Sequence, residues 1–152
     1  MLSTIKIFIQ EHLIISNETE EDESSNIQLA AAMLFVEVMY ADHTTNSLEE
    51  QAVHSALKKC FDMTQEDIEK LIFLAKQKAK EVTSLHEYTS IIHRGLSLEE
   101  KIRIVEQIWI IILADNEIDK HEEHLARKIA DLLHLRQSEF IQAKLRVLDE
   151  KS

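Results

Sequence analysis

The chain has 152 residues and a mass of 17.7 kDa, the size of one domain with a sizeable core. Its single Gly and absent Pro exclude a glycine-rich phosphate loop and tight two-residue hairpins, so the composition predicts a helical protein. With 17 Lys and Arg against 28 Asp and Glu, the net charge of −11 argues against nucleic acid and favours cations or proteins with a basic face as partners.

Five helix starts are marked by a small polar residue that precedes a carboxylate by three positions. These residues are Ser47, Thr64, Ser84, Ser97 and Asp119. Together with the apolar periodicity, and with Gly95 as a C-terminal stop, they predict eight helices. The predicted helices cover residues 2–13, 27–41, 48–60, 65–81, 85–94, 98–114, 120–133 and 138–149.

The first 26 residues are predicted to stand apart from the main domain, which covers residues 27–152. Residues 2–13 are predicted to form an amphipathic helix, and we expect its apolar stripe to dock onto the main domain. Residues 17–26 (NETEEDESSN) are acidic and lack an apolar pattern, so a solvated loop is predicted there.

Two of the predicted helices are apolar nearly all round, at residues 29–40 (LAAAMLFVEVMY) and 104–114 (IVEQIWIIILA). Helices of this kind are buried on most sides, so the sequence predicts an all-α fold in which amphipathic helices surround two central ones. Trp109 is then a core residue whose ring N–H donates to a carbonyl.

Two glutamates, Glu37 and Glu106, lie within these central helices. An unpaired buried carboxylate costs several kcal/mol, roughly, so each should have a partner. Arg94, Arg103 or a helix N-terminus are the expected partners; alternatively, the two glutamates line a functional cleft.

The chain contains an internal repeat. When it is shifted against itself, Ala41-Asp42 aligns with Ala114-Asp115, and Glu49-Glu50 aligns with Glu122-Glu123. The shared pattern is a buried helix, then Asp-x-x-x-Asn/Asp-x-x-Glu, then an amphipathic helix. The repeat therefore predicts two helix–loop–helix units about a pseudo-twofold axis.

Charge is placed unusually in this repeat, because Asp42 and Asp115 follow the C-terminal ends of helices. The helix dipole disfavours an anion there by about 0.3–1 kcal/mol. A divalent cation held by the helix-end carbonyls, this Asp and the following Glu would offset the cost. The second unit is the richer in carboxylates, with Asp115, Glu117, Asp119, Glu122 and Glu123.

A purely structural interpretation remains open. Asp42 and Asp115 can accept loop N–H groups in Asx-turns, and Asp119 with Glu122 fits a capping box. The loops are not EF-hands, because they lack the glycine at position 6 and the glutamate at position 12.

Seven segments, taken in their order along the chain, form a pattern that can be compared with known families. They are Glu37 with Ala41-Asp42 and Glu49, Tyr88-Thr89, Leu96-Ser-Leu-Glu-Glu100, Val105-Glu106-Gln-Ile-Trp109, Ala114-Asp115-Asn-Glu-Ile-Asp119, Glu122-Glu123-His124 and Ile129-Ala-Asp-Leu-Leu133. In these segments the chain resembles the tellurite-resistance protein B (TerB)-like family of bacterial helical domains, over about residues 27–148.

The resemblance implies an all-α fold of two pseudo-symmetric units and a divalent-metal site for Ca²⁺, Mg²⁺, Mn²⁺ or Zn²⁺. Carried over by position, the ligands are Asp42, Glu49, Asp115, Asp119 and Glu122. The family usually has Gly-Glu-Ile-Asp after the first Ala-Asp, where this chain has His43-Thr44-Thr45-Asn46. Either the first unit is a weaker half-site, or His43 is a substitute ligand.

No nucleophile–base pair is identifiable, and His121-Glu-Glu-His124 lacks the spacing of a zinc protease, so we expect a protein that is not an enzyme. The first hypothesis is a TerB-like, stress-response-associated domain that binds a divalent cation and presents an acidic face to a protein partner. A second is a helical interaction scaffold with an acidic face and no metal. A third is a metal-assisted hydrolase, which would need an open coordination position.

The cellular setting follows from what the sequence lacks. Cys60 is the only cysteine, so we expect a reduced, cytoplasmic protein without a disulfide or a thiolate zinc site, and an inert buried thiol. The apolar runs are too short for a membrane span, and the N-terminal sequence lacks the pattern of a secretion signal.

Overall fold

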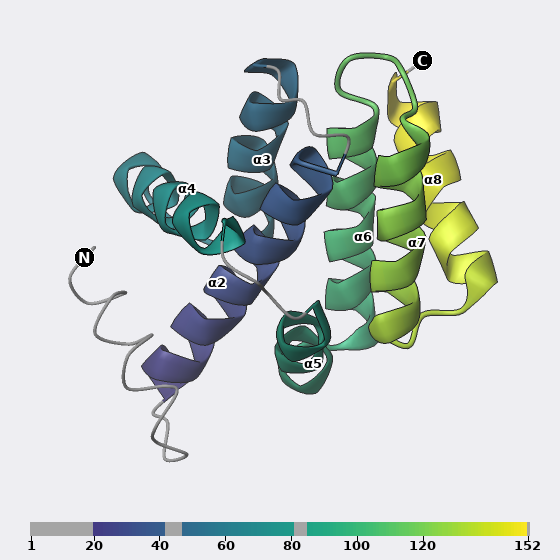
Figure 1. Cartoon of the computed structure of the whole chain (residues 1–152). Coiled ribbons are helices and arrows are strands. Elements are labelled where there is room, and N and C mark those ends of the chain that lie inside the picture. Colours follow the sequence, from purple (N-terminus) through teal and green to yellow (C-terminus); the bar gives the residue numbers. More distant parts are fainter. Residues whose placement is uncertain (1–19, 42–46, 81–84, 152) are drawn as a thin grey trace.

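The computed structural model describes residues 20–41, 47–80 and 85–151, and this part of the chain forms seven α-helices without strands (Figure 1). The helices are α2 (Glu20–Met39), α3 (Ser47–Cys60), α4 (Gln65–Ala79), α5 (Leu85–Gly95), α6 (Leu98–Ile112), α7 (Lys120–Leu132) and α8 (Gln137–Lys151). The all-α prediction is confirmed, and seven of the eight predicted helices are present within a few residues of their expected ends, except at the start of α2. The predicted helix over residues 2–13 lies outside the described residues.

The predicted loop over residues 17–26 is wrong from residue 20 onward, because α2 begins at Glu20. Carboxylates in the first turn of a helix are favoured by its dipole, and no Gly or Pro interrupts this segment. Asn26 and Ile27 are buried, so the helix also packs before the predicted apolar run begins. The acidic composition therefore marks a helix start here.

Gly95 ends α5, as predicted, but in a different way from the expected helix stop. Its φ is not positive, so it does not terminate the helix through the left-handed conformation. A Cβ at this position would lie 2.5 Å from Ile27 Cδ1, so the glycine permits the close approach of α5 to α2.

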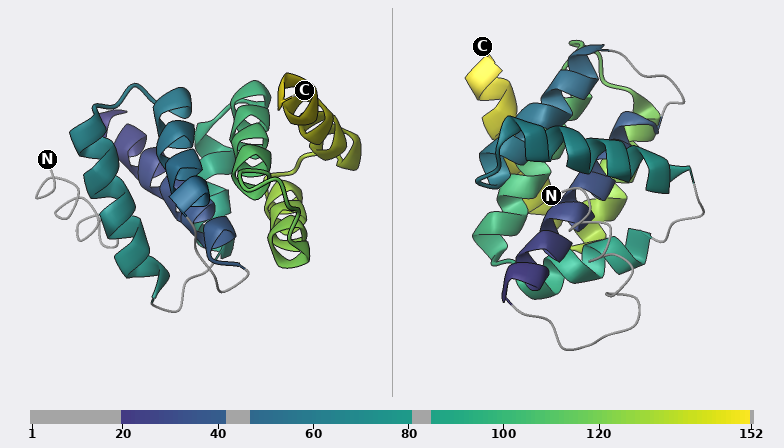
Figure 2. Two further views of the ribbon diagram at one scale, coloured as in Figure 1. Left: turned by 90° about the horizontal axis from the view of Figure 1, so that it is seen from above. Right: turned by 90° about the vertical axis from the view of Figure 1, so that its left-hand side faces the viewer.

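The core is centred on α2 and α6, which confirms the prediction of two buried central helices. Residues 30–36 of α2 are all buried, as are five of the isoleucines and valines of α6, Ile104, Val105, Ile108, Ile111 and Ile112. The other helices surround this pair, with α4 and α8 on opposite flanks (Figure 2). No helix in the described part is both long and apolar enough to cross a membrane.

Both central helices end at the same end of the bundle, where α3 and α7 begin (Figure 1). The two following helices pack crosswise, because α3 contacts α6 as well as α2, and α7 contacts α2 as well as α6. This arrangement is compatible with the two predicted helix–loop–helix units; their pseudo-twofold relation stays a prediction.

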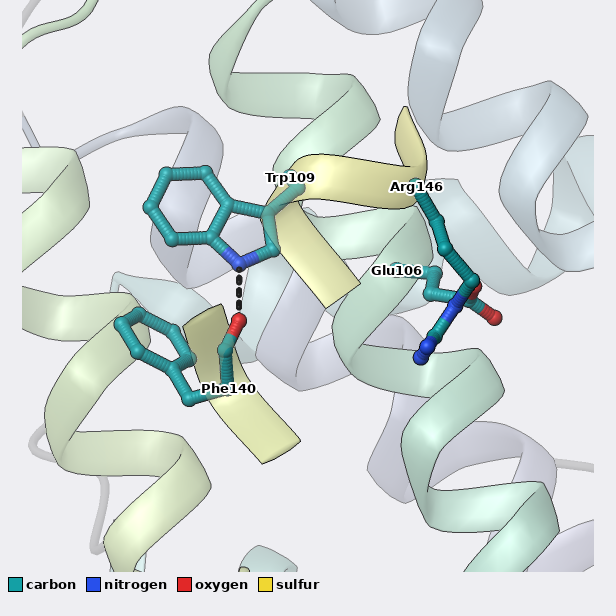
Figure 3. Close-up of polar contacts among 4 residues, drawn as sticks. All are labelled: Glu106, Trp109, Phe140 and Arg146. Atoms are coloured by element: carbon teal, nitrogen blue, oxygen red, sulfur yellow. Dashed lines mark hydrogen bonds and ion pairs between the residues drawn. The ribbon is translucent and has the colours of Figure 1, made fainter. Parts of the chain in front are cut away.

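Trp109 attaches α8 to the central helix α6 (Figure 3). Its Nε1–H donates to the carbonyl oxygen of Phe140 at 3.2 Å, and the two ring centroids are 4.9 Å apart. Trp109 is fully buried, so the prediction of a core tryptophan with a carbonyl acceptor is confirmed.

Glu106 is paired, as expected, but its partner is Arg146 of α8 (Figure 3). The Arg146 Nε donates to Glu106 Oε2 at 2.7 Å, so the predicted partners Arg94 and Arg103 are wrong for this glutamate. Glu37 also makes a polar interaction. Pairing thus accounts for Glu106 without a functional cleft.

The helix-start signals at Thr64, Ser97 and Asp119 are confirmed. Ser47 instead lies inside α3 as its first residue. The Thr64 hydroxyl accepts the N–H of Asp67 at 3.1 Å. Ser97 and Glu100 form a complete capping box at the start of α6, with the Ser97 N–H donating to Glu100 Oε1 at 2.9 Å. Ser84 lies outside the described residues.

A buried lysine, Lys101, joins α5, α6 and α7. Its ammonium donates to the carbonyl oxygen of Leu133, where α7 ends, at 3.1 Å, and lies 2.9 Å from Nδ1 of His93. Since the ammonium is a donor, His93 accepts through Nδ1 in its neutral form. The His134 ring lies 4.1 Å from that of His93, so a proton on His93 would meet two neighbours that disfavour it.

The pH dependence of stability tests this junction. Desolvation, the Lys101 charge and His134 all hold the pKa of His93 below its ordinary value of 6.5. The unfolded chain therefore takes up this proton at a higher pH than the folded chain, so the stabilisation from neutral His93 is complete above about pH 6.5 and is lost as the pH falls below it. We expect the free energy of unfolding, measured with urea, to fall less between about pH 7.5 and pH 5.5 in His93→Gln than in the wild type.

The matched control is His86→Gln, because His86 is an exposed histidine of the same helix. Its pH profile should follow that of the wild type. Identical pH profiles for the wild type and His93→Gln would contradict this account of the junction.

Candidate functional site

The candidate site lies at the end of the bundle where α2 and α6 end and α3 and α7 begin (Figure 1). Glu49 lies in the first turn of α3, and Glu122 lies in the first turn of α7. These two glutamates are only 1% and 2% exposed, although charged residues are almost never fully buried without compensation. Both belong to the predicted ligand set, and the repeat aligns them with each other.

The two Glu-Glu pairs of the repeat, Glu49-Glu50 and Glu122-Glu123, are arranged in the same way. In each pair the first glutamate is buried, and the second forms an ion pair with a basic side chain. Glu50 accepts from Lys76 of α4, and Glu123 lies 3.9 Å from Arg127, one turn later on α7. The buried members, Glu49 and Glu122, also make polar interactions.

The connection from α6 to α7 places Asp115 in a turn. Asn116 has a φ of 64°, in the left-handed region that asparagine tolerates better than most residues, and its N–H donates to the Leu113 carbonyl at 3.0 Å. Asp115 Oδ1 accepts the N–H of Glu117 at 3.1 Å. This is the Asx-turn that the structural interpretation of Asp115 predicts.

Asp119 is the N-cap of α7, as predicted. Its Oδ1 accepts two backbone N–H groups, from His121 at 2.8 Å and from Glu122 at 3.1 Å. Because both bonds use one oxygen, Oδ2 of Asp119 makes no hydrogen bond within the described part of the chain. Asp119 therefore caps α7 with one of its two carboxylate oxygens.

The structure tests the predicted ligand set only in part. Asp42 and the possible substitute His43 lie in residues 42–46, outside the described residues. Among residues 20–41, 47–80 and 85–151, no three His, Cys, Asp or Glu side chains are grouped so that they could hold a metal ion. Whether Asp42, Glu49, Asp115, Asp119 and Glu122 act together thus stays a prediction.

Comparison with known proteins identifies the family. The sequence profile described as "Tellurite resistance protein TerB" matches residues 28–145. The chain belongs to the TerB family. This assignment confirms the resemblance found in the sequence and extends over most of the bundle.

The fold of this TerB-family chain is also present in a solved structure. A crystal structure of a protein of unknown function from Porphyromonas gingivalis W83 aligns with a TM-score of 0.59 and 18% identity, over 82% of this chain and 95% of that one. At this identity the likeness shows the fold alone. No curated protein matches the chain.

The sequence does not predict some of the contacts around the site. The ion pair between Glu50 and Lys76 joins residues 26 positions apart, and the sequence carries no local signal for it. The contrast between Glu49 and Glu50 has a signal in the helical period, because Glu49 falls on the same face as the buried Val53, Ala52 and Ala56.

Substitution of Asp119 separates capping from other roles. We expect Asp119→Ala to lower the free energy of unfolding by about 1 kcal/mol, because two N–H groups of α7 lose their acceptor. Asp119→Asn should stay within a few tenths of a kcal/mol, roughly, since asparagine caps as well as aspartate. Urea denaturation of both variants measures this, and an Asp119→Ala variant as stable as the wild type would contradict the capping role.

Proposed function

We propose that this TerB-family domain is a non-enzymatic, cation-binding protein of the tellurite-resistance or stress-response type. A divalent cation binds at the end of the bundle where α2 and α6 end. The ligands come from both units of the repeat: Asp42, Glu49, Asp115, Asp119 and Glu122. The acidic surface around this site is the face offered to a protein partner with a basic face.

The burial of Glu49 and Glu122 is the observation that carries the proposal. A buried carboxylate loses its hydration and requires positive charge or hydrogen-bond donors nearby. Glu49 and Glu122 each already make a polar interaction, and Lys76 and Arg127 pair with the neighbouring Glu50 and Glu123. A cation shared by the two units would add positive charge beside both buried carboxylates.

The donor chemistry restricts the cation. The ligands carried over by position are all carboxylates, and oxygen ligands suit hard cations such as Mg²⁺, Ca²⁺ and Mn²⁺. His43 as a ligand in place of one carboxylate would favour Zn²⁺, because zinc prefers nitrogen and sulfur donors. The bound ion would supply charge compensation and would hold the two units together at this end.

A second candidate function is a protein-interaction scaffold without a metal. Two large apolar side chains at the same end favour it, because Leu48 and Ile118 are 50% and 43% exposed. Exposed apolar side chains among acidic ones are typical of a docking surface. A partner with a basic, apolar surface fits both hypotheses, so only cation binding distinguishes them.

Calorimetric titration tests the proposal. We expect one Mg²⁺, Ca²⁺ or Mn²⁺ ion to bind to each chain and to raise the melting temperature, because an ion that binds only the folded state stabilises it. The double variant Asp115→Asn with Glu122→Gln should lose the binding heat and the shift while keeping its helical circular dichroism.

The matched control is Glu99→Gln with Asp131→Asn, which removes the same charges from exposed positions outside this end of the bundle. It should bind the cation as the wild type does. If none of Mg²⁺, Ca²⁺, Mn²⁺ and Zn²⁺ produces a binding heat or a shift of the melting temperature, the metal proposal fails. The hypothesis of an interaction scaffold without a metal then remains.

A further inference from the structure

A basic groove lies between α7 and the start of α8, where the chain turns from one helix into the other (Figure 1). Its volume is about 420 Å³. Residues 135–137 and Phe140 line one side of this α7–α8 groove, and α7 lines the other with His124, Arg127, Lys128 and Asp131. Residues three and four positions apart share a helix face, so the α7 residues form one continuous wall.

The turn between the two helices holds the groove in shape. His134 has a φ of 65°, and its N–H donates to the carbonyl oxygen of Asp131 at 3.0 Å. The N–H of Leu135 donates to the carbonyl oxygen of Ala130, also at 3.0 Å, which completes a Schellman motif at the end of α7. This backbone is hydrogen-bonded before any ligand binds, so binding does not have to order it.

The floor of the groove is apolar. Ala130, Leu135 and Phe140 line it and belong to the hydrophobic core, and most of the exposed lining is apolar. Phe140 packs against Trp109, with 4.9 Å between the ring centroids, so the core fixes the position of the floor. An apolar side chain that lies on this floor is removed from water.

Three cations line the groove against a single carboxylate. The cations are Arg127, Lys128 and Arg136, and the carboxylate is that of Asp131. The guanidinium of Arg127 lies over the Phe140 ring, 5.1 Å from its centroid, which places it above the apolar floor. The groove is thus a local excess of positive charge on a chain whose net charge is −11.

These cations have few partners within the chain. Arg127 lies 3.9 Å from Glu123 in a partly exposed pair, and such pairs contribute little. Within residues 20–41, 47–80 and 85–151, the side chains of Lys128 and Arg136 make no hydrogen bond or ion pair. All three can therefore pair with carboxylates of a ligand.

The combination of floor and charge restricts the ligand. A free phosphate would use the cations but not the apolar floor. A nucleic acid would extend beyond the groove, where the net negative charge of the chain repels it. Since a single exposed ion pair contributes little, several carboxylates on one chain are needed to use the three cations together.

We propose that the α7–α8 groove binds a short acidic segment of a partner protein. Carboxylates of the segment pair with Arg127 and Arg136, and an apolar side chain between them lies on Leu135 and Phe140. The site is independent of the cation proposal, because it uses none of the predicted metal ligands. Its partner is acidic, in contrast to the basic partner expected at the other end of α7.

An NMR titration of the full chain with synthetic peptides tests the proposal. The probe is the acetylated and amidated peptide EDFDE, with KRFRK as its charge-reversed match and EDSDE as the match without an aromatic ring. We expect EDFDE to shift the amide signals of Leu135, Arg136 and Gln137 until they saturate, and to leave that of Glu49 unchanged. KRFRK should not shift the groove signals, and EDSDE should bind at least about threefold more weakly, since it buries less apolar surface.

The double variant Arg127→Gln with Arg136→Gln assigns the binding to the guanidinium groups. It should weaken the binding of EDFDE at least about tenfold, as expected for the loss of charge-assisted hydrogen bonds. Lys58→Gln with Lys59→Gln removes the same charge from exposed positions of α3 outside the groove and should bind EDFDE as the wild type does. Raising NaCl from about 0.05 to about 0.5 M should weaken the binding to the wild type, which tests the charges without a substitution.

Three results would overturn the proposal: no saturable shift of the groove signals with EDFDE, equal binding of EDFDE and EDSDE, or equal binding of EDFDE by the Arg127→Gln, Arg136→Gln variant and the wild type. A failure of cation binding at the Glu49 and Glu122 end would leave these outcomes unaffected.

Discussion

The packing of α2 against α6 is the constraint on which the rest of the structure depends. Both helices are apolar nearly all round, so each must be covered on most sides, and the remaining helices supply that cover. Since both end at the same end of the bundle, the first turns of α3 and α7 come to that end as well (Figure 1). The position of Glu49 and Glu122 is therefore a consequence of core packing.

Local signals in the sequence predicted the helices because capping and apolar periodicity act within a few residues. Thr64, Ser97 and Asp119 cap their helices as expected. The acidic start of α2 was missed because its composition is that of a solvated loop, whereas no residue in it stops a helix. The partner of Glu106 was missed because Arg146 is 40 positions away, and such pairings depend on the tertiary fold.

The sequence singles out the residues of the candidate site, but it does not show which contact each of them makes or which of them are buried. Asp115 accepts a backbone N–H of the α6–α7 connection and Asp119 accepts two of the first turn of α7, as the Asx-turn and capping interpretations predict. Which glutamate of each pair is buried follows from the helical period together with the placement of α3 and α7 on the core.

The central claim is that the two repeat units together bind one divalent cation, with Glu49 and Glu122 among its ligands. Paramagnetic broadening by Mn²⁺ in the ¹⁵N-resolved NMR spectrum measures this most directly, because the effect falls steeply with distance from the ion. At substoichiometric Mn²⁺ we predict that the amide signals of Glu49 and Glu122 broaden together while those of the α6 N-terminus at Glu99 and Glu100 stay sharp. Broadening at only one of the two units, or evenly at all acidic residues, would contradict the claim.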